Sequence, residues 1–251
     1  MTTTTTTGSS APPDIDDDLV RVARTTGLIY LAFFVVGILG FLVVRPQLYV
    51  ADDPQGTLDN LLGSEALARL GIVLELGIVL SQALVAVWFY RLFRRVDRVA
   101  AGALAGFGLV NAVVILSSAA VLATALDVAQ DESLSGQGDP AVTVQMLYAL
   151  SGNLWGVGAL FFGLWLIPMG WLVLRSGWMP RVLGWLLVVA GVLYLGSALL
   201  TYLFPDAASA IDLMTVPASV GEAWIMGYLV IFGVRRRAAT PAPGAESAAT
   251  P

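Results

Sequence analysis

Long apolar runs alternate with short polar segments along most of the chain. Six such runs, each of about twenty residues or more, lie at about 25–44, 68–90, 100–126, 149–174, 182–204 and 215–234. A helix rises 1.5 Å per residue, so each run can cross a hydrocarbon core of about 30 Å. A barrel strand would need only about ten residues of alternating polarity. The pattern therefore predicts an all-α fold, a six-helix transmembrane bundle.

The two ends of the chain have a different composition. Residues 1–20 begin "MTTTTTTGSSAPPDIDDD", which is polar, acidic and of low complexity, and residues 238–251 are rich in Ala, Pro and Thr. Such segments bury too little apolar surface to offset the entropy of ordering. We expect two disordered polar tails around one transmembrane domain at 21–237.

The overall composition agrees with a membrane protein and narrows the chemistry. The chain is 57% hydrophobic and 12% charged, with a mean hydropathy of +0.81. Soluble domains are about 45–50% apolar and about 25% charged. It contains no cysteine and no histidine, which excludes disulfides, thiolate chemistry and the commonest metal ligands. We expect no metal and no cofactor.

The arginines predict how the bundle is oriented. All thirteen basic residues are arginine, and eleven lie before, between or after the runs on one side. These are Arg21, Arg24, Arg91, Arg94, Arg95, Arg98, Arg175, Arg181, Arg235, Arg236 and Arg237. The other side has only Arg45 and Arg69, and its loops are acidic. The positive-inside rule then places both termini in the cytoplasm of a cell with a bacterial-type plasma membrane. Because topology accounts for the arginines, nucleic-acid binding has no support.

The first outer loop contains a short helical pattern. Turn residues stand at Asp53-Pro54, and Leu58, Leu61 and Leu62 follow at helical spacing. The spacing predicts a short amphipathic helix on the outer membrane interface.

Three segments resemble a known family. They are "LRSGWMPRVLGWLLVVAGVLYL" at 174–195, "ARTTGLIYLAFFVVGILG" in the first run and "EALARLGIVLELGIVL" in the second. The pattern resembles the domain-of-unknown-function 4386 family of uncharacterised bacterial integral-membrane proteins, over most of 20–234. The resemblance implies a multi-pass membrane protein and supplies no activity, substrate or catalytic residue.

The inner hairpin at 174–181 has a structural interpretation. Gly177 can end the fourth helix in the left-handed conformation, and Pro180 suits the opening of the fifth. Arg175 and Arg181 would lie at the cytoplasmic headgroups. A lipid-headgroup or partner site at this hairpin is the alternative.

Small residues mark one face of the fourth helix, which Pro168 should bend. They are Gly152, Gly156, Ala159, Gly163 and Gly170. Such a groove lets another backbone approach closely. It predicts either packing within the chain or a homo-oligomer interface.

Two glutamates, Glu75 and Glu222, lie inside apolar runs. An ionised acid at the centre of a bilayer costs roughly 2.5–3.5 kcal/mol on insertion scales, so neither should face lipid in charged form. We expect both at similar depth in the outer half of the membrane. The polar residues expected to face inward with them are Gln82, Asn111, Asn153, Arg69 and Ser219, with Arg69 able to meet Glu222 across the bundle.

Two functions compete for this candidate cluster. In the first, the acids and amides form an internal clasp that holds the helices in register within a non-catalytic structural or interaction component. In the second, Glu75 and Glu222 are protonatable groups of a small-solute or ion transporter. No phosphate-binding loop, nucleophile elbow or metalloprotease motif is present in the sequence, so we expect no enzyme. Neither a substrate nor a protein partner follows from the residues.

Overall fold

The first helix begins inside the expected N-terminal tail. The computed structural model describes residues 16–235, and the rest of both tails lies outside the described residues. The Asp16 side chain accepts the backbone N–H of Leu19 at 2.7 Å, and Asp17 and Asp18 stand in the first turn. A capping carboxylate and acidic residues at a helix N-terminus both stabilise the helix. Residues 17–20 are therefore helical and not part of the tail.

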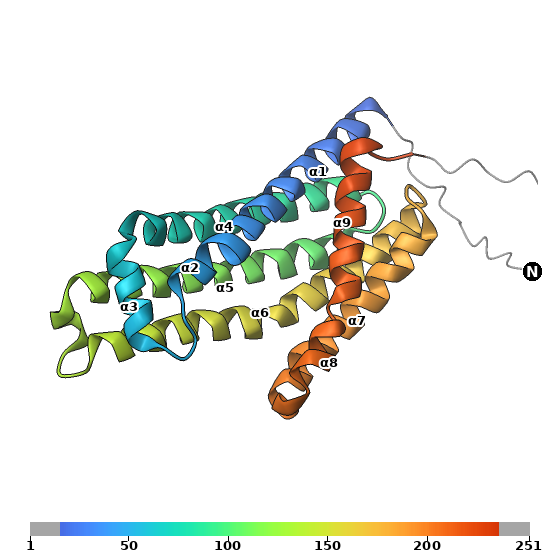
Figure 1. The fold of residues 1–251 in the computed structure, drawn as a ribbon. Helices are drawn as coiled ribbons and strands as arrows, with labels where there is room; N and C mark the ends of the chain where they lie inside the picture. Colours follow the sequence, from blue (N-terminus) through green and yellow to red (C-terminus); the bar gives the residue numbers. More distant parts are fainter. Residues whose placement is uncertain (1–15, 236–251) are drawn as a thin grey trace, which may run out of the picture.

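Six long helical units make up the described chain (Figure 1). Their bounds are α1 (Asp17–Ile38) continued by the π-helical turn η1 (Leu39–Val44) and α2 (Arg45–Leu48); α4 (Glu65–Phe93); α5 (Arg98–Gln130); α6 (Pro140–Ser176); α7 (Arg181–Leu203); and η3 (Pro205–Ala207), α8 (Ala208–Leu213) and α9 (Val216–Ile231). Two shorter helices, α3 (Pro54–Gly63) and η2 (Glu132–Ser135), lie in connections. All six units are long and apolar enough to cross a membrane, and residues 16–235 contain no strand. This confirms the predicted fold class.

The six units cross in alternating directions and form a ring. One end of the ring, which we name the proximal end, contains the start of α1, the end of α9 and the short connections at 94–97 and 177–180 (Figure 1). The connections at 49–64, 131–139 and 204–215 form the distal end. Around the ring, α1 packs against α4, α4 against α5, α5 against α6, α6 against α7, α7 against α9, and α9 again against α1. Helix α1 thus separates α4 from α9.

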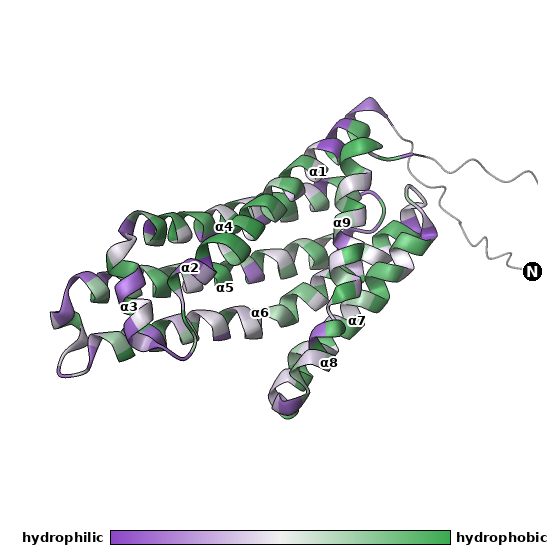
Figure 2. Ribbon diagram, in the orientation of Figure 1, coloured by the Kyte–Doolittle hydropathy of each residue, from purple (hydrophilic) through white to green (hydrophobic). Residues whose placement is uncertain are grey.

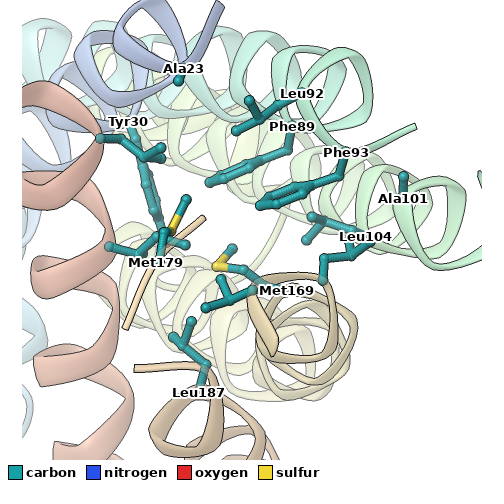
Figure 3. Packing of buried hydrophobic residues seen from close by; sticks show 14 of the residues in the cluster. Ala23, Tyr30, Phe89, Leu92, Phe93, Ala101, Leu104, Met169, Met179 and Leu187 are labelled. Carbon is teal, nitrogen blue, oxygen red and sulfur yellow. The ribbon is translucent and has the colours of Figure 1, made fainter. Parts of the chain in front are cut away.

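The proximal half of the ring is filled by a large aromatic and aliphatic core. Tyr30, Phe89 and Phe93 are fully buried there and meet Met169 (Figure 3). The Phe93 ring stacks on Trp178 with centroids 5.8 Å apart. These contacts join α1, α4, α6 and the hairpin before α7 in one packed layer.

The distal half has a second core that α3 covers. Leu61 is fully buried, Leu58 is nearly so, and they pack with Val144 and Ala125. The predicted short helix therefore exists, but its apolar face lies against α5 and α6. Only Leu62 of the three expected leucines is exposed.

The outer surface of the ring is apolar between its two ends. Figure 2 shows hydrophobic residues along the helices and hydrophilic ones gathered at the connections. Leu42 is 72% exposed, and Leu80 and Val189 are exposed as well. Contiguous exposed apolar surface of this extent indicates a lipid-facing surface.

Candidate functional site

A chain of hydrogen bonds joins four helices near the distal end. Nη1 of Arg45 on α2 donates to Oγ of Ser151 on α6 at 3.1 Å, and Ser151 Oγ lies 2.8 Å from Oγ of Ser118 on α5. Ser118 donates in turn to Oε1 of Glu75 on α4 at 3.3 Å. Because Ser118 has one proton and gives it to Glu75, Ser151 is the donor between the two hydroxyls. Every bond of this distal polar chain therefore points from the guanidinium to the carboxylate.

The π-helical turn η1 directs Arg45 into the bundle. The backbone N–H of Arg45 donates to the carbonyl of Gly40, five residues earlier. One extra residue in a turn rotates the helix that follows by about 100°. The guanidinium then lies 5.5–5.8 Å from the ring centroids of Phe41, Tyr49 and Tyr148, and its Nη2 donates to the Tyr148 carbonyl at 3.2 Å. Cation–π contacts and a carbonyl thus hold a charge that was expected in the outer loop.

One carboxylate oxygen of Glu75 remains without a partner. Glu75 is only 5% exposed, and Oε1 accepts a second bond, from Nε1 of Trp155 at 3.2 Å. Oε2 is buried and has no hydrogen-bond partner among residues 16–235. Glu75, Arg45 and Tyr148 line a cavity of about 20 Å³. That volume accommodates about one water molecule.

A second polar contact lies deeper along the same helices. Nδ2 of Asn111 on α5 donates to Oε1 of Gln82 on α4 at 3.1 Å, and both side chains are buried. Gln82 follows Glu75 by two turns, so α4 and α5 are joined by polar bonds at two depths. These three residues were all expected to face inward, and the structure places them so.

The other intramembrane acid belongs to a separate group. The hydroxyl of Tyr30 on α1 donates to Oε1 of Glu222 on α9. Tyr30 is fully buried, with edge-to-face contacts to Phe89 and Trp165 at centroid distances of 5.6 and 6.0 Å. Nε1 of Trp165 is buried and has no hydrogen-bond partner within the described part of the chain. This pair ties α9 to α1 inside the proximal core.

The expected cluster is therefore divided, and three of its members are elsewhere. Arg69 does not reach Glu222: it forms an exposed ion pair with Glu65, one turn away, at 2.7 Å. Asn153 and Ser219 are exposed and take no part in either polar group. Arg69 cannot meet Glu222 because α1 lies between α4, which carries Arg69, and α9, which carries Glu222.

The two acids also differ in depth. Glu75 stands 18 residues from Phe93 at the proximal end of α4, or about 27 Å at 1.5 Å per residue. Glu222 stands nine residues from Ile231 at the end of α9, or about 14 Å. They do not share the single outer level expected from the sequence.

The glycine face of α6 serves packing within the chain at its proximal half. A Cβ added to Gly163 would lie 3.0 Å from the carbonyl oxygen of Gly191 on α7, and one added to Gly170 would lie 2.5 Å from that of Gly184. The seven-residue spacing on both helices lets their backbones meet twice. Gly152 and Gly156, at the distal half, are exposed.

The proximal hairpin has the predicted form, except that Pro180 precedes the first turn of α7 as its N-cap residue. Helix α6 ends at Ser176, and Gly177 follows in the left-handed conformation with φ +67°. Pro180 is the N-cap residue, and α7 begins at Arg181. Pro168 lies within α6, which continues through it.

Arg175 has a partner on the neighbouring connection. Its Nη1 lies 2.5 Å from Oδ2 of Asp97, which also caps α5. The backbone N–H of Ala100, then that of Val99 and the Arg175 guanidinium, lower the pKa of the Asp97 carboxyl below its usual value. The ion pair thus connects the two short proximal connections.

The residues that complete these contacts were not predicted. Ser118, Ser151 and Trp155 lie in apolar runs and look like ordinary span residues. The one available signal for Arg45 was its position directly after the glycine-rich "GILGFLVV". Among residues 16–235, no three His, Cys, Asp or Glu side chains gather as a metal-binding group.

Comparison with known proteins identifies one family. The family model described as domain of unknown function DUF4386 matches residues 25–233. No curated protein and no solved structure matches the chain.

Proposed function

Because the chain belongs to the DUF4386 family, whose description assigns no activity, we propose its role from geometry: a non-catalytic structural or interaction component of the plasma membrane. The observation that carries this proposal is the distal polar chain. It joins α2, α6, α5 and α4 through Arg45, Ser151, Ser118 and Glu75. A polar bond between helices is favoured where lipid offers no alternative partner, so such a chain holds the helices in one register.

The other polar contacts support the same role. Gln82–Asn111 joins α4 to α5, and Tyr30–Glu222 joins α1 to α9. In both contacts the two side chains belong to different helices. The space beside Glu75 holds about one water molecule, which leaves no room for a substrate to react there. We propose no catalytic activity at this site.

The arginine distribution supports the orientation. Eleven of the thirteen arginines belong to the proximal end or to the segment that follows it in sequence. Of the other two, Arg45 is partly buried in the distal polar chain and Arg69 is paired with Glu65. We propose that the proximal end, with both termini, faces the cytoplasm.

One observation favours a small-solute or ion transporter as the second candidate. Glu75, whose Oε2 has no hydrogen-bond partner among residues 16–235, lines a cavity together with Arg45. Intramembrane carboxyls in such surroundings serve as proton relays in transporters. In this reading Glu75 would act without Glu222, since the two lie in separate groups.

Proton flux and stability distinguish the two candidates. Liposomes containing the protein and a trapped pH-sensitive dye should acidify no faster than protein-free liposomes. Glu75→Gln should lower the free energy of unfolding by about 1–2 kcal/mol, because an uncharged amide oxygen accepts the bonds from Ser118 and Trp155 more weakly than a carboxylate oxygen. Glu65→Gln, at an exposed pair, should leave stability nearly unchanged.

Proton flux that Glu75→Gln abolishes and Glu65→Gln preserves would establish the transporter instead. If Glu75→Gln changed neither flux nor stability, both candidates would be wrong.

A further inference from the structure

We propose that a hollow at the proximal end, between the start of α7 and the end of α9, binds the phosphodiester headgroup of an anionic phospholipid. The hollow has a volume of about 400 Å³. Its charged lining residues are Arg181, the first residue of α7, and Arg235, which follows α9. Neither guanidinium forms an ion pair with a carboxylate among residues 16–235. Two unneutralised cations facing one space are suited to an anion.

Arg235 is held in place by the hairpin. Gly233, with φ +67°, turns the chain after α9. The backbone N–H of Arg235 then donates to the Trp178 carbonyl at 3.4 Å, and the Tyr228 hydroxyl donates to the same carbonyl at 3.2 Å. The guanidinium carbon lies 4.6 Å from the ring centroid of Phe232. The position of this cation is thus built into the fold.

The N-terminus of α7 adds to the positive potential. Pro180, the N-cap residue, makes no side-chain capping bond, and Pro180, Arg181 and Val182 all line the hollow. The free N–H groups at the start of a helix and the positive end of its dipole both favour an anion. Helix α7 has 23 residues, so its dipole is fully developed.

The surroundings favour a lipid over free phosphate. Val182 is 68% exposed and Trp185 is 58% exposed, and Val189 continues the same face of α7. Ile231 at the end of α9 is also exposed. A phosphodiester between the two arginines would leave its acyl chains along this apolar face, and the Trp185 ring suits the headgroup level. Free phosphate would gain nothing from that face.

Lipid-dependent stability of matched variants tests the proposal. The full-length protein is reconstituted in nanodiscs of phosphatidylcholine with increasing phosphatidylglycerol, and its unfolding temperature is followed. We expect phosphatidylglycerol to raise this temperature, and the double variant Arg181→Gln/Arg235→Gln to need about tenfold more of it for the same effect. Arg91→Gln/Arg94→Gln removes the same charge from two proximal arginines that do not line the hollow, and should respond like the unchanged protein.

Three results would overturn the proposal. Equal weakening in both double variants would show diffuse attraction to a charged surface. The same stabilisation by inorganic phosphate in pure phosphatidylcholine would assign the site to a free anion. An unfolding temperature independent of phosphatidylglycerol would show no anionic lipid site. Unfolding in pure phosphatidylcholine checks that every variant is folded.

Discussion

Replacing Arg45 by methionine should lower the free energy of unfolding by about 2 kcal/mol. The change removes the cation from one end of the distal polar chain, so Ser151 Oγ loses its donor, while the Tyr148 carbonyl keeps only its bond within α6. A hydrogen bond to a charged group contributes about 1.5–3 kcal/mol, and a buried acceptor left unpaired costs a similar amount. Equilibrium unfolding in mixed detergent micelles measures the loss.

A double-mutant cycle with Glu75 shows whether the two charges act together. Glu75→Leu alone should also destabilise the protein, but Arg45→Met/Glu75→Leu should cost less than the sum of the single changes, because paired charges replaced by apolar groups leave no uncompensated charge. Arg69→Met is the control, because its exposed pair with Glu65 should contribute less than about 1 kcal/mol. Strict additivity would show that the hydrogen-bonded chain does not couple its ends.

Replacing Gly170 by leucine should cost about 3 kcal/mol or more. The new Cβ would lie 2.5 Å from the carbonyl oxygen of Gly184 and 2.8 Å from the backbone nitrogen of Val188. Both atoms belong to the backbone of α7 and cannot rotate away, so α6 and α7 would have to separate. Overpacking of a buried site costs about 1–3 kcal/mol and sometimes more. Thermal unfolding in detergent should report the loss.

Gly106 on α5 supplies the matched control. A Cβ there would meet nothing within 4 Å, and the residue is exposed. Gly106→Leu should be neutral or slightly stabilising, because glycine is a poor helix former. If Gly106→Leu and Gly170→Leu lowered the unfolding temperature equally, the close contact between the backbones of α6 and α7 would not be the cause.

The six spans could be predicted because their signals are local, although α1 begins at Asp17 and α6 at Pro140, about eight or nine residues before the apolar runs. An apolar run of twenty residues, a capping glycine such as Gly177 and the leucine spacing of α3 each depend only on neighbouring residues. That Glu75 faces inward also follows from the cost of a charge in lipid. These predictions agree with the structure.

The partners of the acids could not be predicted because they depend on the order and rotation of the helices. The sequence does not reveal that α1 separates α4 from α9, so Arg69 looked like a partner for Glu222. It does not show the π turn that brings Arg45 inward. Tyr30 and Glu222 lie 192 residues apart. In the same way, the glycine face of α6 was visible, but the reciprocal glycines of α7 were needed to identify its partner.

Cysteine labelling tests most directly that the chain crosses the membrane with both termini in the cytoplasm. The protein has no cysteine of its own, so single substitutions report their own side. Gln137→Cys lies between η2 and α6 at the distal end, and Arg94→Cys lies between α4 and α5 at the proximal end. A membrane-impermeant maleimide should label the Gln137 variant in intact cells and the Arg94 variant only after permeabilisation. Labelling of Arg94→Cys in intact cells, or protection of Gln137→Cys, would contradict the account.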